Sequence, residues 1–191
     1  MGRKDKRKKP FIDETKLAAV LPGMLKSAQT LLEFDDFEWK RGDPDALAFG
    51  NIIATTMIAA QCTELLLKYK LEREGCSFKK NTHDLDNLYK ILGKESKAEI
   101  QQKFDEEKLT IKLPTGWDNV ESLFLKARKA LVYWRYVVNS PNGSATIYPK
   151  VLYIAAVSVY KTTPIVGLAL TREEVTDPEI KAAIFGEPQS R

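Results

Sequence analysis

Two charged side chains in this sequence lie where the pattern calls for apolar residues, which makes them the first candidates for chemistry. Glu64 falls on an apolar stripe of a long helix predicted from Asp45 to Glu74, and Arg135 follows Leu131 by four positions on a second helix. A carboxylate is costly to bury unless it is paired, and a guanidinium offers two parallel hydrogen bonds. We therefore hypothesise that Glu64 pairs with Arg135; the alternative is that both charged groups reach water at the edge of a bundle.

Most catalytic constellations are absent from the sequence. It holds a single histidine, His83, and none of the patterns HExxH, GxSxG, GxGxxG, GxxxxGK(S/T) or paired CxxC. Acidic neighbours such as Asp35 and Asp36 lie in charged flanks without an apolar pocket, which favours solvated surface. Cys62 and Cys76 match neither a disulfide framework nor a zinc site. We expect reduced thiols, no bound metal and no cofactor.

The positive charge is concentrated in the first ten residues, where six basic side chains stand against one acid: Arg3, Lys4, Lys6, Arg7, Lys8 and Lys9. The net charge of this run exceeds the formal net charge of +4 for all 191 residues, so the remainder of the chain is close to neutral. Such a run is typical of a disordered, solvated arm, here residues 1–12; contact with nucleic acid or a membrane surface is the alternative. The folded part has no net basic footprint, which argues against a broad phosphate-binding surface.

Helical periodicity dominates the rest of the sequence, without a ladder of strands and turn signals. We predict one domain over residues 13–186 and a short tail at 187–191. Helices are expected at 13–34 with a kink or division at Pro22-Gly23, and at 45–74, 82–92, 119–139, 147–160 and 178–185, with an exposed helix or hairpin arm at 98–108. The fold class is therefore all-α, an up-and-down bundle of four to six helices.

The boundaries of these elements carry their own signals. Asp43 is the expected N-cap of the long helix, with Pro44 in its first turn and Gly75 as its C-cap. Thr82 is the expected N-cap of the short helix after it, and residues 34–42 are expected to form a linking loop.

A capping-box spacing from Thr115 to Asp118 opens the helix at 119–139, which we expect to pack on the long central helix. The most apolar window, residues 52–67, holds several Thr residues, Gln61 and Glu64, so it is too polar for a membrane span. We expect a soluble, cytoplasmic protein that does not enter a membrane.

Three short runs together resemble the HEPN superfamily (higher eukaryotes and prokaryotes nucleotide-binding). They are Ala60-Gln61-Cys62-Thr63-Glu64-Leu65-Leu66-Leu67-Lys68, then His83-Asp84-Leu85 with Leu88, then Trp134-Arg135-Tyr136. The resemblance covers about residues 45–140, with a following helix at 147–161. It implies a HEPN-like helical bundle that forms a homodimer. Many members of that family are metal-independent ribonucleases, whose motif is an arginine, four to six further residues, and a histidine.

The histidine of that ribonuclease motif is missing here. The matching positions are Ser140, Pro141 and Asn142 after Arg135, and Tyr133, Trp134 and Arg135 after Arg128. Without an imidazole near the arginine, no obvious group handles a 2′-hydroxyl proton near neutral pH. His83 belongs to a different run, and for it we expect helix capping or packing beside Asp84 rather than catalysis.

The sequence thus favours a non-catalytic, HEPN-like binding or assembly module in which Glu64 and Arg135 fix a pair of core helices. The resemblance implies a homodimer and a protein partner from a neighbouring gene, as in prokaryotic defence or toxin–antitoxin units. One alternative is a divergent ribonuclease in which Arg135, with Asn139 or a tyrosine, stabilises the scissile phosphate of RNA. Another is a nucleic-acid-associated protein that acts through its basic N-terminal arm.

Overall fold

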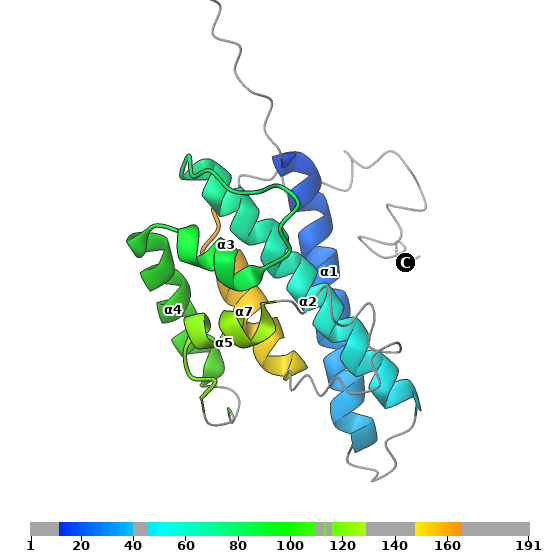
Figure 1. Ribbon diagram of the computed structural model, residues 1–191. Helices are drawn as coiled ribbons and strands as arrows, with labels where there is room; N and C mark the ends of the chain where they lie inside the picture. Colours follow the sequence, from blue (N-terminus) through cyan, green and yellow to red (C-terminus); the bar gives the residue numbers. More distant parts are fainter. Residues whose placement is uncertain (1–11, 40–45, 110–112, 114–115, 129–147, 166–191) are drawn as a thin grey trace, which may run out of the picture.

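Every regular element in the described part of this computed structural model is an α-helix (Figure 1). The structure describes residues 12–39, 46–109, 113, 116–128 and 148–165. Its helices are α1 (Glu14–Trp39), α2 (Ala46–Arg73), α3 (Leu85–Ile91), α4 (Lys94–Lys108), α5 (Val120–Ala127) and α7 (Pro149–Lys161). The all-α class is confirmed for these residues. The helix expected at 178–185, the tail and the basic arm lie outside them.

Helix α1 runs alongside α2 for most of its length (Figure 1). Its buried face carries Leu17, Leu21, Leu25 and Ala28. Of the kink or division expected at Pro22-Gly23, the division is wrong, because one helix continues through Pro22 as far as Trp39. The linking loop expected from residue 34 is likewise helical up to 39. Burial of the leucine stripe against α2 offsets the cost of the interior proline, about 3 kcal/mol, and no helix breaker stands between Gly23 and Trp39.

Helix α2 is the element around which the described helices pack, as the sequence predicted. It contacts α1, α3 and α7, and its buried residues lie on several sides of the helix. It ends at Gly75 with φ +70°, where Cys76 N–H donates to Leu71 C=O at 2.8 Å and Gly75 N–H to Glu72 C=O at 3.1 Å. This pair of bonds is the Schellman motif, so the predicted glycine C-cap is confirmed. Asp43 and Pro44 lie outside the described residues.

One segment in the described part of the chain, Gly50–Arg73 of α2, is long and apolar enough to cross a membrane. This is a statement about length and composition alone, and 56% of its most apolar window is buried inside the molecule. A core helix of a globular protein meets the same criterion, and Glu64 and Lys68 lie within this segment.

Helices α3 and α4 differ from the expectation at their starts. Asp84, not Thr82, is the N-cap of α3, because its carboxylate accepts from the Asn87 N–H at 3.1 Å. The segment expected as an exposed helix or arm from residue 98 is the packed helix α4, which begins at Lys94 and lies against α7. Ile100 and Phe104, four positions apart, are fully buried and form its core-facing stripe. Two large side chains are enough to bury one face of an otherwise charged helix.

Helix α5 begins after Asn119, whose side chain accepts from the Ser122 N–H at 2.7 Å. Val120, Phe124 and Ala127 are fully buried, as their spacing predicted. The described part of this segment packs mainly on α3, so the expectation that it packs on the central helix is wrong for these residues. Helix α7 confirms the prediction for 147–160, with a proline in its first turn.

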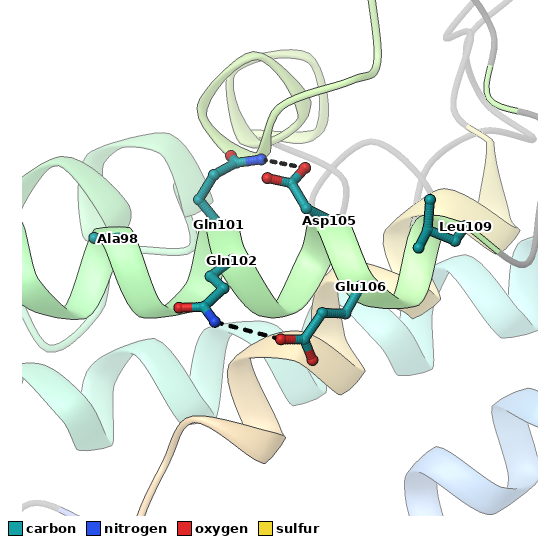
Figure 2. A pocket seen from close by; sticks show the side chains of 6 residues that line it. All are labelled: Ala98, Gln101, Gln102, Asp105, Glu106 and Leu109. Atoms are coloured by element: carbon teal, nitrogen blue, oxygen red, sulfur yellow. Dashed lines mark hydrogen bonds between the residues drawn. The ribbon is translucent and has the colours of Figure 1, made fainter.

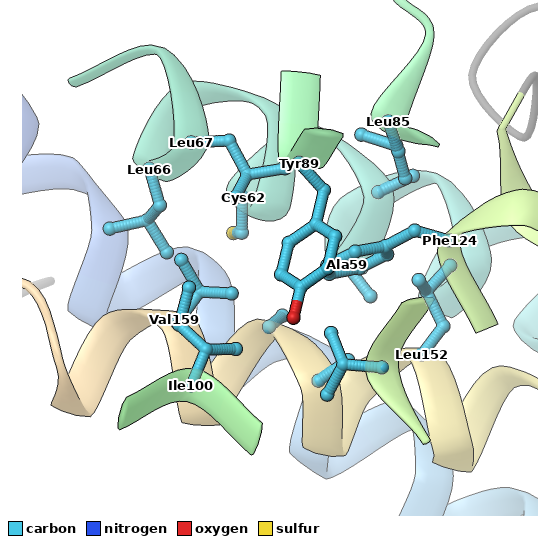
Figure 3. Close-up of a cluster of buried hydrophobic side chains, with 14 of the residues drawn as sticks. Ala59, Cys62, Leu66, Leu67, Leu85, Tyr89, Ile100, Phe124, Leu152 and Val159 are labelled. Atoms are coloured by element: carbon cyan, nitrogen blue, oxygen red, sulfur yellow. The ribbon is translucent and has the colours of Figure 1, made fainter. Parts of the chain in front are cut away.

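The core lies where α2, α3, α4, α5 and α7 meet. Figure 3 shows the Tyr89 ring among apolar side chains drawn from these helices, with Phe124, Leu152 and Val159 among its labelled residues. The rings of Tyr89 and Phe124 meet edge to face, 5.2 Å apart at an angle of 64°. This contact couples α3 to α5 and closes the core on the side away from α1.

Candidate functional site

Glu64 is a buried carboxylate on the central helix. The residue is 7% exposed, and its neighbour Thr63 is turned back on the helix, with its hydroxyl donating to Ala59 C=O at 2.8 Å. Each carboxylate oxygen of Glu64 has a partner among the described residues: Oε1 accepts from Lys68 Nζ at 2.7 Å, and Oε2 lies 2.9 Å from His83 Nδ1. The carboxylate therefore joins two turns of α2 to the connection that leads into α3.

Lys68 is the residue that the sequence reasoning missed. It is 3% exposed, and its ammonium group also donates to Lys80 C=O at 2.9 Å. The i,i+4 spacing of Glu64 and Lys68 was the available signal, since such pairs face each other on one side of a helix. Because the two charges compensate each other inside the protein, the pair is buried without a net charge.

His83 presents its imidazole from the connection between α2 and α3. Its side chain is 45% exposed, while the Glu64 side chain beneath it is 9% exposed. In the neutral ring, a proton on Nδ1 donates to the carboxylate and leaves Nε2 as an acceptor. The carboxylate thus fixes the orientation of the ring and favours one tautomer. The capping role belongs to Asp84, which lies next to His83 but is directed into α3.

The other predicted site residues are outside the described residues. These are Arg135 and Asn139, and the six basic residues of the arm, Arg3, Lys4, Lys6, Arg7, Lys8 and Lys9. The pairing of Glu64 with Arg135 remains a hypothesis. The structure does place Arg128 beside the His83 connection, because Leu85 N–H donates to Arg128 C=O at 3.1 Å.

Two further charged groups, the buried Lys70 and the exposed Glu74, stabilise junctions between helices. Lys70 is 5% exposed and donates to Thr162 C=O at 2.6 Å, at the C-terminal end of α7, where a cation is favourable. Burial lowers the pKa of the Lys70 ammonium group. Glu74 accepts from Gly93 N–H at 2.8 Å and from Ser96 Oγ at 2.5 Å, so it caps the start of α4. Both contacts fix helix ends rather than line a cleft.

The grooves on the described surface include two shallow ones, and neither of these is lined by Glu64 or His83. Figure 2 shows the first along α4, where Gln101 donates to Asp105 and Gln102 to Glu106, beside the exposed Leu109. The second lies between α1 and α2, around Leu17, Val20 and Leu65. Within the described residues, no group of three or more His, Cys, Asp or Glu side chains is placed to hold a metal ion.

Comparisons with the models of known protein families, with curated proteins and with solved structures find no match to this chain.

Proposed function

We propose that this chain is a non-catalytic, HEPN-like helical module for binding and assembly, which acts as a homodimer with a protein partner encoded by a neighbouring gene. On this proposal it serves a two-gene prokaryotic unit of the defence or toxin–antitoxin kind. The resemblance in the sequence supplies the family. The observation that supports a non-catalytic role is that both carboxylate oxygens of Glu64 have partners.

The contacts of Glu64 make it a structural anchor. A general acid or base must reach the proton that it moves. Glu64 is buried, its negative charge is compensated by Lys68, and its second oxygen supports the His83 ring. The cluster ties the connection between α2 and α3 to the core. The cluster therefore stabilises the fold of this connection, and it is not the site of a reaction.

The assembly part of the proposal is tested by the mass of the purified chain in solution. Light scattering on a size-exclusion column should give twice the 21.6 kDa of one chain. Co-expression with the product of the adjacent gene should give a complex that stays together through the same column. A chain that remains monomeric over a wide concentration range and retains no co-expressed partner would contradict the proposal.

A divergent ribonuclease acting through Arg135 remains the second candidate, and the half-exposed imidazole of His83 favours it. That ring is an acid–base group of the kind that the sequence pattern lacked beside its arginines. The backbone carbonyl of Arg128 accepts from the N–H of Leu85, two residues after His83. RNA cleavage that depends on these side chains separates the two candidates.

A third proposal assigns the function to the basic arm, which would bind nucleic acid through phosphate contacts. Binding of this kind falls steeply with salt, because each neutralised phosphate releases counterions. Deletion of residues 1–10 should abolish RNA binding and its salt dependence if the arm is responsible. Binding that survives the deletion would assign the contact to the helical domain.

A further inference from the structure

We propose that the groove between α1 and α2 is the docking site for a C-terminal segment of this same chain, residues 178–185. The groove is largely apolar, and residues 166–191 follow the last described residue, Ile165. The inference goes beyond the proposed function, which assigns no role to this groove. It rests on the chemistry of the groove, on the apolar pattern of the segment and on the place where the described chain ends.

The groove is an apolar surface that the described helices leave partly open. It is lined by Leu17, Val20 and Leu21 of α1 and by Leu65 of α2, among others. Leu17 and Leu21 are buried, whereas Val20 is 51% exposed. Removing apolar surface from water is favourable, so a further apolar element gains stability by covering Val20.

The C-terminal segment carries the apolar pattern that such a groove fits. Ile180, Ala183 and Ile184 have the i, i+3, i+4 spacing of one helical face, and Asp177-Pro178 is a start signal for a helix. Helices shorter than about 12 to 15 residues are marginal in water on their own. The helix predicted at 178–185 therefore needs a tertiary partner for its apolar face.

The described chain ends within reach of the groove. Lys70 donates to Thr162 C=O at 2.6 Å, so α7 ends beside the last turns of α2. Ile12, which lines the groove, donates its N–H to Glu72 Oε2 at 3.1 Å, within the same turn of α2 as Lys70. Residues 166–177 can span about 40 Å when extended, well beyond the roughly 10 Å diameter of a helix.

Charge complementarity supports the same occupant. Asp13 and Lys16 line the groove with exposed side chains, 3.9 Å apart. In the segment, Lys181 and Glu179 carry the opposite charges on either side of Ile180. The segment can therefore bring a cation to Asp13 and an anion to Lys16.

The size of the groove favours a segment of this chain over a second copy. A stable interface between two proteins covers about 800 Å² on each partner, contributed by about 20 to 30 residues. The groove is lined by seven residues. A tethered segment needs less contact area, because its linker holds it at an effective concentration in about the millimolar range.

Val20 gives a direct readout, because docking covers it. Val20→Cys is introduced together with Cys76→Ser, so that the remaining native thiol is the buried Cys62. The rate of iodoacetamide labelling at position 20 is then measured in the full chain. Adding Ile184→Asp should raise this rate about tenfold, because a carboxylate is unfavourable in an apolar contact and releases the segment. Gln189→Asp, which adds the same charge outside the predicted helix, should leave the rate unchanged.

Disulfide cross-linking identifies the occupant. In the same Cys76→Ser chain, Val20→Cys is combined with Ile184→Cys and oxidised at low protein concentration. The two thiols should close a disulfide within one chain, about tenfold faster than in a control that combines Lys26→Cys with Ile184→Cys. Lys26 is exposed on α1 and does not line the groove. Intact mass and non-reducing electrophoresis separate a cross-link within one chain from a linked pair of chains.

Three results would overturn the proposal. They are a labelling rate at position 20 that Ile184→Asp leaves unchanged, equal cross-linking rates for Val20→Cys and Lys26→Cys, and a disulfide that joins two chains instead of closing within one. Backbone amide spectra verify that each variant is folded. None of these results depends on whether the chain dimerises through another surface or cleaves RNA.

Discussion

Lys68 Nζ lies 2.7 Å from Glu64 Oε1, one helical turn away on α2, and both side chains are buried. This pair explains how a charged residue can occupy the apolar stripe of the central helix. The ammonium group has a second acceptor in Lys80 C=O, and the carboxylate has a second partner in His83. The pair is therefore the centre of a small network that joins α2 to the following connection.

Removing one member of this pair should be costly. Glu64→Ala leaves the Lys68 charge buried without its carboxylate, so we expect a loss of about 3 kcal/mol in the free energy of unfolding. Urea denaturation provides the measurement. Lys16→Ala, which disrupts the exposed ion pair with Asp13 at 3.9 Å, is the matched control and should cost less than about 1 kcal/mol.

The double replacement Glu64→Leu with Lys68→Met should recover most of the loss, because apolar side chains of similar size often substitute for a buried ion pair without cost. A single Glu64→Ala variant as stable as the Lys16→Ala control would show that the buried pair does not anchor the helix.

A glycine inside the central helix and the glycine that follows its C-terminal end should respond to alanine in opposite directions. Gly75 has φ +70° and no atom within 4 Å of an added Cβ, so Gly75→Ala meets backbone strain alone and should destabilise by about 1 kcal/mol. Gly50 lies inside α2 with equally open space, so Gly50→Ala should stabilise by about 1 kcal/mol. Thermal unfolding of both variants measures the difference, and a shift of the same sign in both would contradict the assigned helix end.

Helix α4 should behave as part of the core. Phe104 is fully buried, so Phe104→Ala should lower the free energy of unfolding by about 3 to 5 kcal/mol. Leu109, at the end of the same helix, is 84% exposed, and Leu109→Ala should change it by no more than about 0.5 kcal/mol. Similar small losses for both variants would mean that α4 is a peripheral arm after all.

The two cysteines should differ in reactivity. Burial raises the pKa of the Cys62 thiol to about 12, and the thiolate is the form that alkylating reagents attack. Cys76 is only partly buried. At pH 8 the folded protein should therefore take up one equivalent of iodoacetamide, at Cys76, while the denatured chain takes up two. Intact mass followed by peptide mapping locates the adduct, and rapid labelling of Cys62 in the folded protein would contradict its burial.

The class of the fold and its central helix could be predicted from the sequence. The apolar periodicity of α2 extends over several turns and ends at a glycine, so local signals agree with the tertiary outcome. Pro22 led to the wrong prediction that α1 is divided, because packing against α2 keeps the helix continuous despite the proline. Helix α4 was undervalued because its core contact rests on only Ile100 and Phe104, and burial by α7 is not visible in the sequence.

The candidate site was foreseen in part. Glu64 was singled out for a sound physical reason, because a carboxylate on an apolar stripe must find a partner. Lys68 was within reach of the same reasoning through its i,i+4 spacing. The contact with His83, 19 positions along the chain, depends on how the connection after Gly75 folds back on α2, and no local pattern specifies that path.

The measurement that tests the central claim most directly is the fate of RNA incubated with the purified full chain. Structured and single-stranded RNA are followed over time without added metal, beside Arg135→Ala and His83→Ala variants and a Lys26→Ala control. A non-catalytic module predicts that the RNA stays intact with every protein. Cleavage by the wild type and by Lys26→Ala that is lost in Arg135→Ala or His83→Ala would contradict the account and establish the ribonuclease instead.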